Sequence, residues 1–380
     1  MQHGAVPRGA FMRLLKDYGG VRPFRLTEIM RQESPDYRAA AQSLSEGRTL
    51  DGFDALDDMG WVKEHGDDAE RCRLIADEYL NAVRAEKSIL VVSPTHAEAA
   101  AITEAIRSAL RQAGRLGPED RAFTRLVPVN ASEAERGQAS TYRPGDVLQF
   151  HQNAKGGFRK GDRLTVIDPA KVPLGEAAKF SLYRPGAVGL AEGDVIRITG
   201  TVKTIDGKHT LKNGMARTVA AITPAGNLQL DNGWVVGKDA GHFRHGFVET
   251  SFGSQGRTVQ RAILAMSAAS LPATNQEQMY VSASRAKERM TLYTDDKSAV
   301  RLAVQRSSRK LLALDLRLDP KPQRRERLLG HLDRLRRLSV LDRTRSAVAA
   351  LASVEPPARP AMHAERLKAS LPDKEHGYGR

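Results

Sequence analysis

Arginine, glutamine and hydroxyl side chains fall in three separated segments and are the side chains of this sequence best suited to phosphate chemistry. The segments are Phe24–Gln32 (FRLTEIMRQ), Phe247–Val259 (FVETSFGSQGRTV) and Gln276–Lys287 (QEQMYVSASRAK). An arginine guanidinium is planar and always charged, and its rigid fork of donors neutralises phosphate oxygens well. Gly256, inside the second segment, lets the backbone come close to a ligand. These residue types therefore favour the stabilisation of negatively charged phosphate oxygens.

Each segment taken alone also has an ordinary structural interpretation. Arg31-Gln32 after a strand is typical of an exposed pair, and Ser254–Gly256 (SQG) is typical of a turn. Ser284–Lys287 (SRAK) is typical of a solvated helix face. The functional interpretation depends on all three segments occurring in this order, with a stretch of different character between the first and the second.

In this order the three segments resemble motifs four, five and six of superfamily-one DNA helicases. The resemblance is nearest to the TraI/TrwC conjugative relaxase-helicases and their RecD-like relatives. Gln2–Gly9 (QHGAVPRG) looks like the tail of motif three, and Tyr142–Val147 (YRPGDV) looks like the start of the β-barrel insertion of that family. The resemblance extends over most of residues 1–300 and leaves the C-terminal part outside it.

The resemblance implies a role for each candidate residue. The catalytic candidates act on the γ-phosphate of ATP, as arginine fingers or as its sensor: Arg31, Arg285 and Gln2. Other residues would contact the nucleotide: Gln32, Gln255 and Gly256. The remaining candidates would contact DNA: Thr250, Ser254 and Thr258. Phe252, Thr258 and Gln260 depart from residues common in the family, which bears on the coupling of nucleotide to DNA rather than on the fold.

Several elements of a complete enzyme do not occur in the sequence. No Gly-x-x-x-x-Gly-Lys-[Ser/Thr] loop is present to hold the β- and γ-phosphates, and Asp77-Glu78 is predicted to be a solvated pair on a helix face. His242 and His245 are predicted to be polar loop groups, and no metal site is expected. We therefore expect ATP and Mg2+ to bind the complete enzyme and not to bind this chain tightly.

The complete enzyme would be an ATP hydrolase that translocates 5′ to 3′ on single-stranded DNA, by resemblance. Its N-terminal helicase and relaxase half would have to be supplied in cis or in trans. Because Met1 lies inside the motif-three tail, a truncated gene or a mis-assigned start is expected. The alternative is a non-enzymatic remnant of such a helicase that binds nucleic acid or a partner protein. A true start at Met1 would favour this second hypothesis.

The pattern of apolar residues predicts an α/β fold that positions these segments. The pattern predicts a helix around Glu70–Ala85 and then a strand at Ser88–Val92 that is apolar on both faces. A second helix follows, and Thr95 and Glu98 form the capping box at its start. Ile102, Ile106 and Leu110 mark the buried stripe of that helix. The prediction is a RecA-like parallel sheet with helices on both faces, an inserted small antiparallel β-barrel and a basic helical tail.

Four parts of the chain follow from this pattern. Residues 1–140 and 246–305 form the RecA-like domain, with motifs five and six in the second stretch. Residues 141–245 form the inserted barrel, because short strands there alternate with Asn-Gly and Asp-Gly turns. Strands are expected at 195–202, 217–222, 227–230, 259–265 and 290–293, and a helix at 275–287. Residues 306–380 form a basic helical tail that becomes disordered.

Charge and composition support a nucleic-acid partner. The chain has 380 residues with 59 Lys and Arg against 45 Asp and Glu, a net charge of +14 that favours phosphate-rich ligands. Aromatic residues make up only 5%, so contacts to the backbone of single-stranded DNA are expected rather than extensive base stacking. No apolar run is long enough to cross a membrane and no signal peptide is evident, so a cytoplasmic location is expected. Cys72 is the single cysteine, which excludes an intrachain disulfide.

Overall fold

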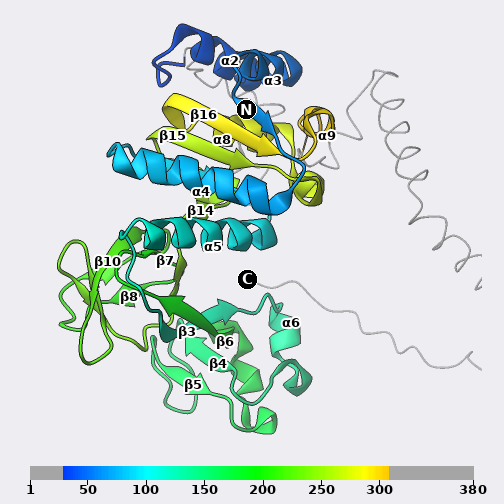
Figure 1. Cartoon of the computed structure of the whole chain (residues 1–380). Coiled ribbons are helices and arrows are strands. Elements are labelled where there is room, and N and C mark those ends of the chain that lie inside the picture. The colour runs from blue at the N-terminus through cyan, green and yellow to red at the C-terminus, as the bar shows by residue number, and fades with distance from the viewer. Residues whose placement is uncertain (1–28, 308–380) are drawn as a thin grey trace, which may run out of the picture. The chain divides into compact units, whose positions relative to one another are not determined.

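Five parallel strands form the central sheet in the computed structural model, which describes residues 29–307 (Figure 1). Their spatial order is β1 (Val62–Glu64), β16 (Ala286–Thr294), β15 (Val259–Ala265), β2 (Ile89–Val92) and β14 (Val248–Glu249). All neighbouring pairs in this sheet run parallel. Parallel strands need crossover connections, and helices supply them on both faces of the sheet.

Alternate residues of the inner strands enter two separate apolar cores. Leu90 and Val92 of β2 face one core, and Val91 between them faces the other. The first core is covered by α2 (Pro35–Ser45), α3 (Thr49–Asp58), α8 (Gln276–Ala283) and α9 (Lys297–Ala303). The second is covered by α4 (Asp68–Arg84) and α5 (His96–Gln112), which lie side by side in Figure 1. The predicted α/β fold with helices on both faces is confirmed.

The predicted stripe of α5 is buried, but its capping box is only half formed. Ile102, Ile106 and Leu110 are all buried, and the Thr95 side chain accepts from the Glu98 amide. The Glu98 carboxylate does not return to the amide of Thr95. It accepts instead from the Ser93 hydroxyl at 2.7 Å and from the Ser267 amide at 3.1 Å. Its partner at Ser267 comes from the chain just after β15, which sequence spacing along α5 could not reveal.

Antiparallel sheets lie between β2 and β14 in the sequence, as predicted. One has the order β12 (Val235–Val236), β11 (Leu228–Leu230), β10 (Ala216–Ile222), β7 (Val195–Ile198) and β13 (Phe243–His245). The other has the order β3 (Arg121–Pro128), β6 (Phe180–Leu190), β4 (Val147–Phe150) and β5 (Arg163–Thr165), and a small hairpin joins β8 (Val202–Lys203) to β9 (Thr210–Leu211). β3 precedes residue 141, where the insertion is predicted to begin; the domain limits remain a prediction.

The helix predicted at 275–287 is too long. α8 ends at Ala283, Ser284 is its C-cap, and β16 begins at Ala286. The reason is strand pairing: the Val259 amide at the start of β15 donates to the Arg285 carbonyl at 3.1 Å, which draws the chain into the sheet. Arg285 therefore lies in the turn between α8 and β16 and not within the helix.

Some predictions concern residues that the structure does not describe. Gln2, the motif-three tail, the first five residues of the segment Phe24–Gln32, where a strand is expected before Arg31, and nearly all of the basic tail lie outside the described residues. Contacts divide the chain into two units, Met1–Arg309 and Lys310–Arg380, so residues 29–307 belong to the first unit. Within the described part of the chain, no helix is long and apolar enough to cross a membrane.

Candidate functional site

Arg31, Gln32 and Arg285 meet around Ser284, at the end of α8. The Arg31 Nη1 and the Gln32 amide nitrogen both donate to the Ser284 carbonyl, the latter at 3.3 Å. The Arg285 Nη2 donates to the Ser284 hydroxyl at 2.8 Å. The predicted residues of motifs four and six, more than 250 positions apart in the sequence, therefore converge on one residue.

The peptide segment that joins α8 to β16 holds these side chains in place. The Arg285 Nε donates to the Val281 carbonyl at 2.7 Å, and the Gln32 amide donates to the Ala286 carbonyl at 2.9 Å. The Tyr37 hydroxyl of α2 donates to the Ala283 carbonyl, and burial raises the pKa of Tyr37 well above its usual value. Tyr37 thus stays a neutral donor. These contacts satisfy backbone carbonyls at the helix end and fix both guanidiniums.

The electrostatics of this group are unusual, because two guanidiniums share one small region without a carboxylate. Neither Arg31 nor Arg285 forms an ion pair with any carboxylate in residues 29–307. Burial, followed by the charge of Arg31, lowers the pKa of Arg285. Arg285 is 4% exposed, Arg31 is half-buried and Gln32 is fully buried, with its Oε1 left without a donor. The arrangement suits an anion that accepts from several donors.

The motif-five loop begins at the carboxyl end of β14. Thr250 caps α7 (Ser251–Ser254), and its hydroxyl accepts from the Gly253 amide at 3.2 Å. Ser254 is buried, and its hydroxyl donates to the Ser251 carbonyl at 2.7 Å. Gly256 has φ +80° with open space around its Cα, so the loop turns there through a conformation that favours glycine. Gln255 is half-buried and Thr258 is exposed.

The structure therefore brings some of the predicted site residues together and separates others. Arg285 adjoins Ala286, which pairs with Val259, so the arginine pair lies at the amino ends of β15 and β16. Thr250 follows Glu249, which lies level with Val92 and hence with Leu264 of β15. Leu264 is about 16 Å of strand from Val259. Thr258 directly precedes Val259 and therefore lies near the arginine pair, at the amino ends of the strands. Thr250 lies at the carboxyl ends of the strands.

Sequence reasoning missed a buried carboxylate beside the motif-five loop. Glu249 is 1% exposed and contacts three arginines, Arg197, Arg244 and Arg257. A charged residue that ends the apolar run Phe247-Val248 was the available signal. The partners on β7 and β13 follow only from strand pairing, which the sequence pattern did not provide.

The solvated pair predicted at Asp77 and Glu78 was wrong for Glu78, and of the two histidines predicted to lie in loops, His242 does and His245 lies in β13. Glu78 accepts from the hydroxyls of Thr291 and Tyr293, both at 2.7 Å, so it anchors α4 to β16, while Asp77 is exposed and pairs with Arg73. His242 lies in a loop but is 2% exposed and packs against Tyr183. Within residues 29–307, no group of His, Cys, Asp or Glu side chains is arranged to hold a metal ion.

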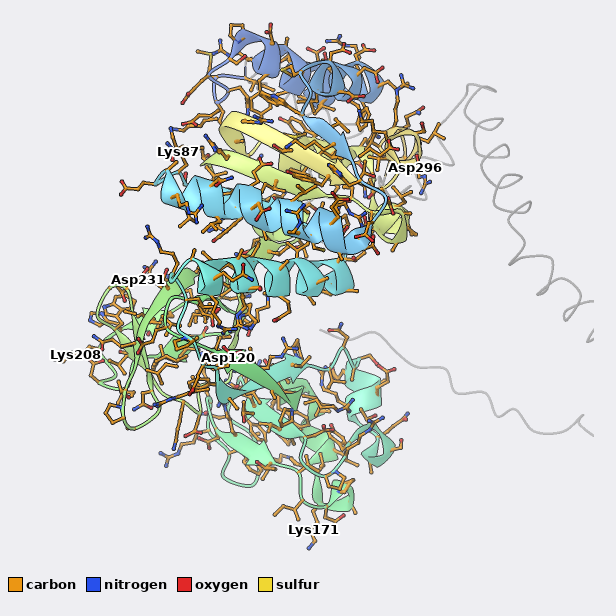
Figure 2. The ribbon with its side chains drawn as sticks, in the orientation of Figure 1. Lys87, Asp120, Lys171, Lys208, Asp231 and Asp296 are labelled. Carbon is orange, nitrogen blue, oxygen red and sulfur yellow. The ribbon has the colours of Figure 1, made fainter. Side chains whose placement is uncertain are left out.

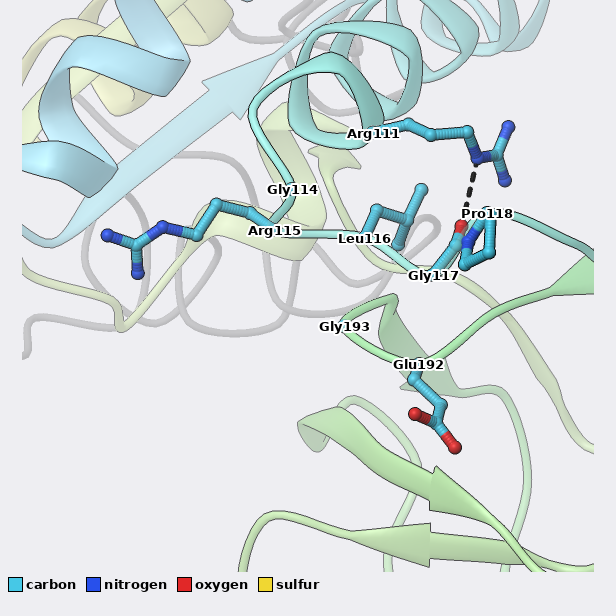
Figure 3. Close-up of a pocket in the computed structure, with 8 residues that line it drawn as sticks. All are labelled: Arg111, Gly114, Arg115, Leu116, Gly117, Pro118, Glu192 and Gly193. Carbon is cyan, nitrogen blue, oxygen red and sulfur yellow. Dashed lines mark hydrogen bonds between the residues drawn. The ribbon is translucent and has the colours of Figure 1, made fainter.

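The surface hollows lie away from these groups. A hollow of about 500 Å³ follows the end of α5, where the Arg111 Nε donates to the Gly117 carbonyl at 3.0 Å (Figure 3). Arg115 extends away from Arg111 and Glu192 in that view. A second hollow of about 490 Å³ lies beside the stacked rings of His209 and Trp234. None of the site residues predicted from the sequence lines either hollow.

Comparisons with known proteins agree on one group of relatives. A family model described as an AAA domain matches residues 1–67. The multifunctional conjugation protein TraI of Escherichia coli is 28% identical over 194 residues, 42% of this chain and 11% of the relative. TraI of Escherichia coli strain K12 is 27% identical over 206 residues, 46% of this chain and 12% of the relative. The chain thus spans only about a tenth of the length of these curated relatives.

Solved structures give more distant matches. One match is a structure titled as showing DNA unwinding at forked double-stranded DNA by two coordinating Pif1 helicases. It has a TM-score of 0.38 and 15% sequence identity, and the match covers 79% of this chain and 60% of the helicase chain. The Pif1 helicase from Bacteroides in complex with ADP-AlF3 and single-stranded DNA also has a TM-score of 0.38 and 15% identity, and covers 72% and 52%.

Proposed function

We propose that this chain, which is similar to TraI over less than half of its length, is a superfamily-one helicase domain that supplies the arginine fingers and part of the single-stranded DNA groove of an ATP-dependent DNA helicase. The nucleotide would be held mainly by a domain that carries the phosphate-binding loop, which this sequence lacks. That domain would act in cis or in trans.

The arginine pair at Ser284 is the observation that carries the proposal. Two guanidiniums held side by side, with no carboxylate of residues 29–307 paired to either, repel one another, and their burial strengthens this repulsion. A triphosphate placed against them would remove the repulsion and accept their donors. Charge that develops on the γ-phosphate during hydrolysis would be stabilised by guanidiniums already fixed in position, which is how arginine fingers act.

ATP and Mg2+ fit this edge of the sheet only in part. The arginine side chains here are donors, and the Oε1 of Gln32, which has no hydrogen-bond partner, could accept from a bound ligand or its water. Mg2+ prefers oxygen ligands and phosphate oxygens, which the arginine pair does not provide. This chain would therefore contact the outer phosphate, and Gln32, Gln255 and Gly256 would complete the contacts to nucleotide.

Single-stranded DNA is the proposed polymer partner. Thr250 and Thr258 present hydroxyls on the motif-five loop, and buried Ser254 would shape that loop from within. The inserted strands predicted at 141–245 would border the groove. The arginine pair and Thr250 lie at opposite ends of the strands of one parallel sheet. That sheet would therefore connect the nucleotide to the DNA as a single rigid element.

The test restores the phosphate-binding half and measures ATP turnover with single-stranded DNA present. We expect Arg31→Ala and Arg285→Ala each to lower turnover by about 10³-fold or more, with little change in nucleotide affinity. Arg285→Lys keeps the charge but loses the planar fork, so it should remain badly impaired. Arg261→Ala is the matched control, because Arg261 lies in the same sheet and pairs loosely with Glu288 at 4.0 Å.

Near-normal turnover in both alanine variants would refute the finger assignment. Lost nucleotide affinity with normal turnover at saturation would instead make both residues affinity residues. A reconstituted protein that binds single-stranded DNA but never hydrolyses ATP would support the non-enzymatic alternative.

A further inference from the structure

Arg197 of β7 and Arg244 of β13 lie directly opposite one another in an antiparallel pair. Like charges at directly opposed positions of two strands destabilise a sheet. If this sheet had no role beyond folding, replacing Arg197 or Arg244 with an uncharged residue would make it more stable. The pair is held by Glu249, whose carboxylate accepts from the Arg197 Nη1 and, at 3.2 Å, from the Arg244 Nη2. The stability of this part of the fold therefore depends on a carboxylate that belongs to β14 of the parallel sheet.

A third arginine makes the positive charge exceed what Glu249 can neutralise. The Arg257 Nη1 lies 3.4 Å from Glu249 Oε1. One carboxylate faces three guanidiniums, which leaves a surplus of positive charge at a partly buried position. Burial, followed by the charges of Arg244 and Arg257, lowers the pKa of Arg197 to about 10, so the guanidinium stays charged at neutral pH.

The same cluster contacts the motif-five loop directly. The Arg197 Nη2 donates to the Gly253 carbonyl at 3.3 Å, and Arg257 follows the loop in the chain. A Cβ on Gly253 would lie 2.9 Å from Glu249 Oε2, so this position must lack a side chain for the carboxylate to reach its partners. Arg197, Glu249 and Gly253 thus form a fixed support that joins the loop to the antiparallel sheet.

Exposure separates the inner guanidinium from the outer two. The side chain of Arg197 is 12% exposed, whereas those of Arg244 and Arg257 are 32% and 38% exposed. Arg244 is further oriented because its Nη1 donates to the carbonyls of His245 and Val248, at 2.9 and 3.2 Å. Two oriented and accessible guanidiniums beside a buried support match the oxygens of a phosphate group.

We propose that Arg244 and Arg257 bind one phosphodiester group of single-stranded DNA, on a support made by Arg197 and Glu249, so that the antiparallel insertion and the motif-five loop share a DNA contact. The inference rests on the proposed function, because it takes single-stranded DNA as the polymer. A nucleotide triphosphate is the other source of the same chemistry. Glu249, which holds Arg197 and Arg244, lies at the carboxyl end of β14, whereas the arginine pair lies at the amino end of β16. Arg257 reaches this carboxylate from the chain that precedes β15, and the position of the carboxylate favours DNA.

The experiment uses the full chain and a fluorescent oligothymidylate titrated across a salt series. Each phosphate contact to single-stranded DNA contributes about 0.7 to the slope of log affinity against log salt. We expect Arg244→Gln and Arg257→Gln each to weaken binding several-fold. Because the two arginines share one phosphate, we expect the double variant to reduce the magnitude of the slope by about 0.7. Arg244→Lys should keep the slope and lose part of the affinity. Arg217→Gln is the matched control: Arg217 lies in the same sheet, its side chain is also 32% exposed, and it pairs with Asp231 at 3.8 Å.

Every outcome of this experiment bears on the proposal. Unchanged affinity and slope in both glutamine variants, with normal binding by the wild type, would overturn the phosphodiester site and leave the proposed function standing. A wild type without salt-dependent binding would overturn both. Displacement of the oligonucleotide by ATP from the wild type, but not from Arg257→Gln, would assign the site to nucleotide instead. Thermal melting shows whether each variant folds. If Arg244→Gln does not fold, Arg257→Gln still tests the site, because Arg257 lies outside the strands.

Discussion

At the scale of single residues, the environment of each charged group decides which role it can have. Glu78 and Glu249 are both carboxylates next to apolar residues in the sequence, yet Glu78 accepts from two hydroxyls and Glu249 from arginines. The first pair of contacts anchors a helix to the sheet. The second leaves positive charge in excess, and only such an excess attracts an anionic ligand. The contacts therefore distinguish Glu78, which anchors a helix, from Glu249, which holds a cluster of arginines.

His242 provides a prediction at the same scale, because its surroundings oppose protonation. Its Nε2–H donates to Gln149 Oε1 at 2.5 Å, and its buried Nδ1 has no partner. Burial, followed by the charge of Arg163, lowers the pKa of His242 from 6.5 to about 4. The unfolded chain therefore takes up this proton first as the pH falls. The contribution of His242 to stability is complete above pH 6.5 and is lost progressively between 6.5 and about 4.

We expect the free energy of unfolding of the wild type to fall by about 2 kcal/mol more than that of His242→Gln between about pH 7.5 and pH 5. Urea denaturation at each pH measures this difference. The glutamine variant keeps an N–H for Gln149 and has no titrating ring, so the comparison removes the effect of other groups. Parallel loss of stability in the two proteins would show that His242 protonates freely in the folded state.

At the scale of elements, periodicity predicted the helices well and predicted their ends poorly. The stripe of α5 and the strands β2 and β15 followed from apolar spacing, since burial on defined faces produces that spacing. The end of α8 did not, because the pairing of β15 with Arg285 sets it and no local residue announces it. The candidate arginines came from motif resemblance, while their meeting at Ser284 depends on the tertiary fold.

A buried ion pair joins α5 to the turn before β7 and provides the prediction at this scale. Arg107 donates twice to Asp194, at 2.9 Å for each bond, with side chains 4% and 0% exposed. Arg107 also donates to Asp120 at 2.7 Å; Asp120 is labelled in Figure 2. Although burial alone would raise it, the pKa of Asp194 is lowered by the nearby His245 ring and by hydrogen bonds from Arg107 and the Ala191 amide. The carboxylate is therefore charged and depends on these donors.

Arg107→Met should lower the free energy of unfolding by about 3–5 kcal/mol, because it leaves a buried carboxylate without its partner. Arg111→Met is the matched control one turn further along α5. Its pair with Asp120 is 34% and 36% exposed, so we expect a loss below about 1 kcal/mol. Chemical denaturation of both variants gives the comparison. Equal losses would mean that the exposed and buried pairs contribute alike and that the buried ion pair does not join these elements.

At the scale of the whole molecule, one parallel sheet carries a cluster of arginines at each end of its strands. The amino ends of β15 and β16 carry the arginine pair, and the carboxyl end of β14 carries the cluster at Glu249. Both clusters carry positive charge in excess, which agrees with the net charge of +14. Single-stranded DNA at one end of the strands and a nucleotide at the other end would be connected through the strands of the sheet rather than through loops. Movement of either ligand would then be transmitted without a flexible intermediate.

Under the proposed function, the chain alone would supply only the second half of a nucleotide site, which gives the last prediction. We expect no steady-state ATP hydrolysis by the purified full chain, with or without single-stranded DNA. Arginine fingers accelerate hydrolysis of a nucleotide that is already held with its Mg2+, and no phosphate-binding loop occurs in the 380 residues. Phosphate release measures turnover, and Arg285→Ala is the control for contaminating enzymes. Turnover that survives repurification and disappears in Arg285→Ala would show that this chain holds a complete site of its own.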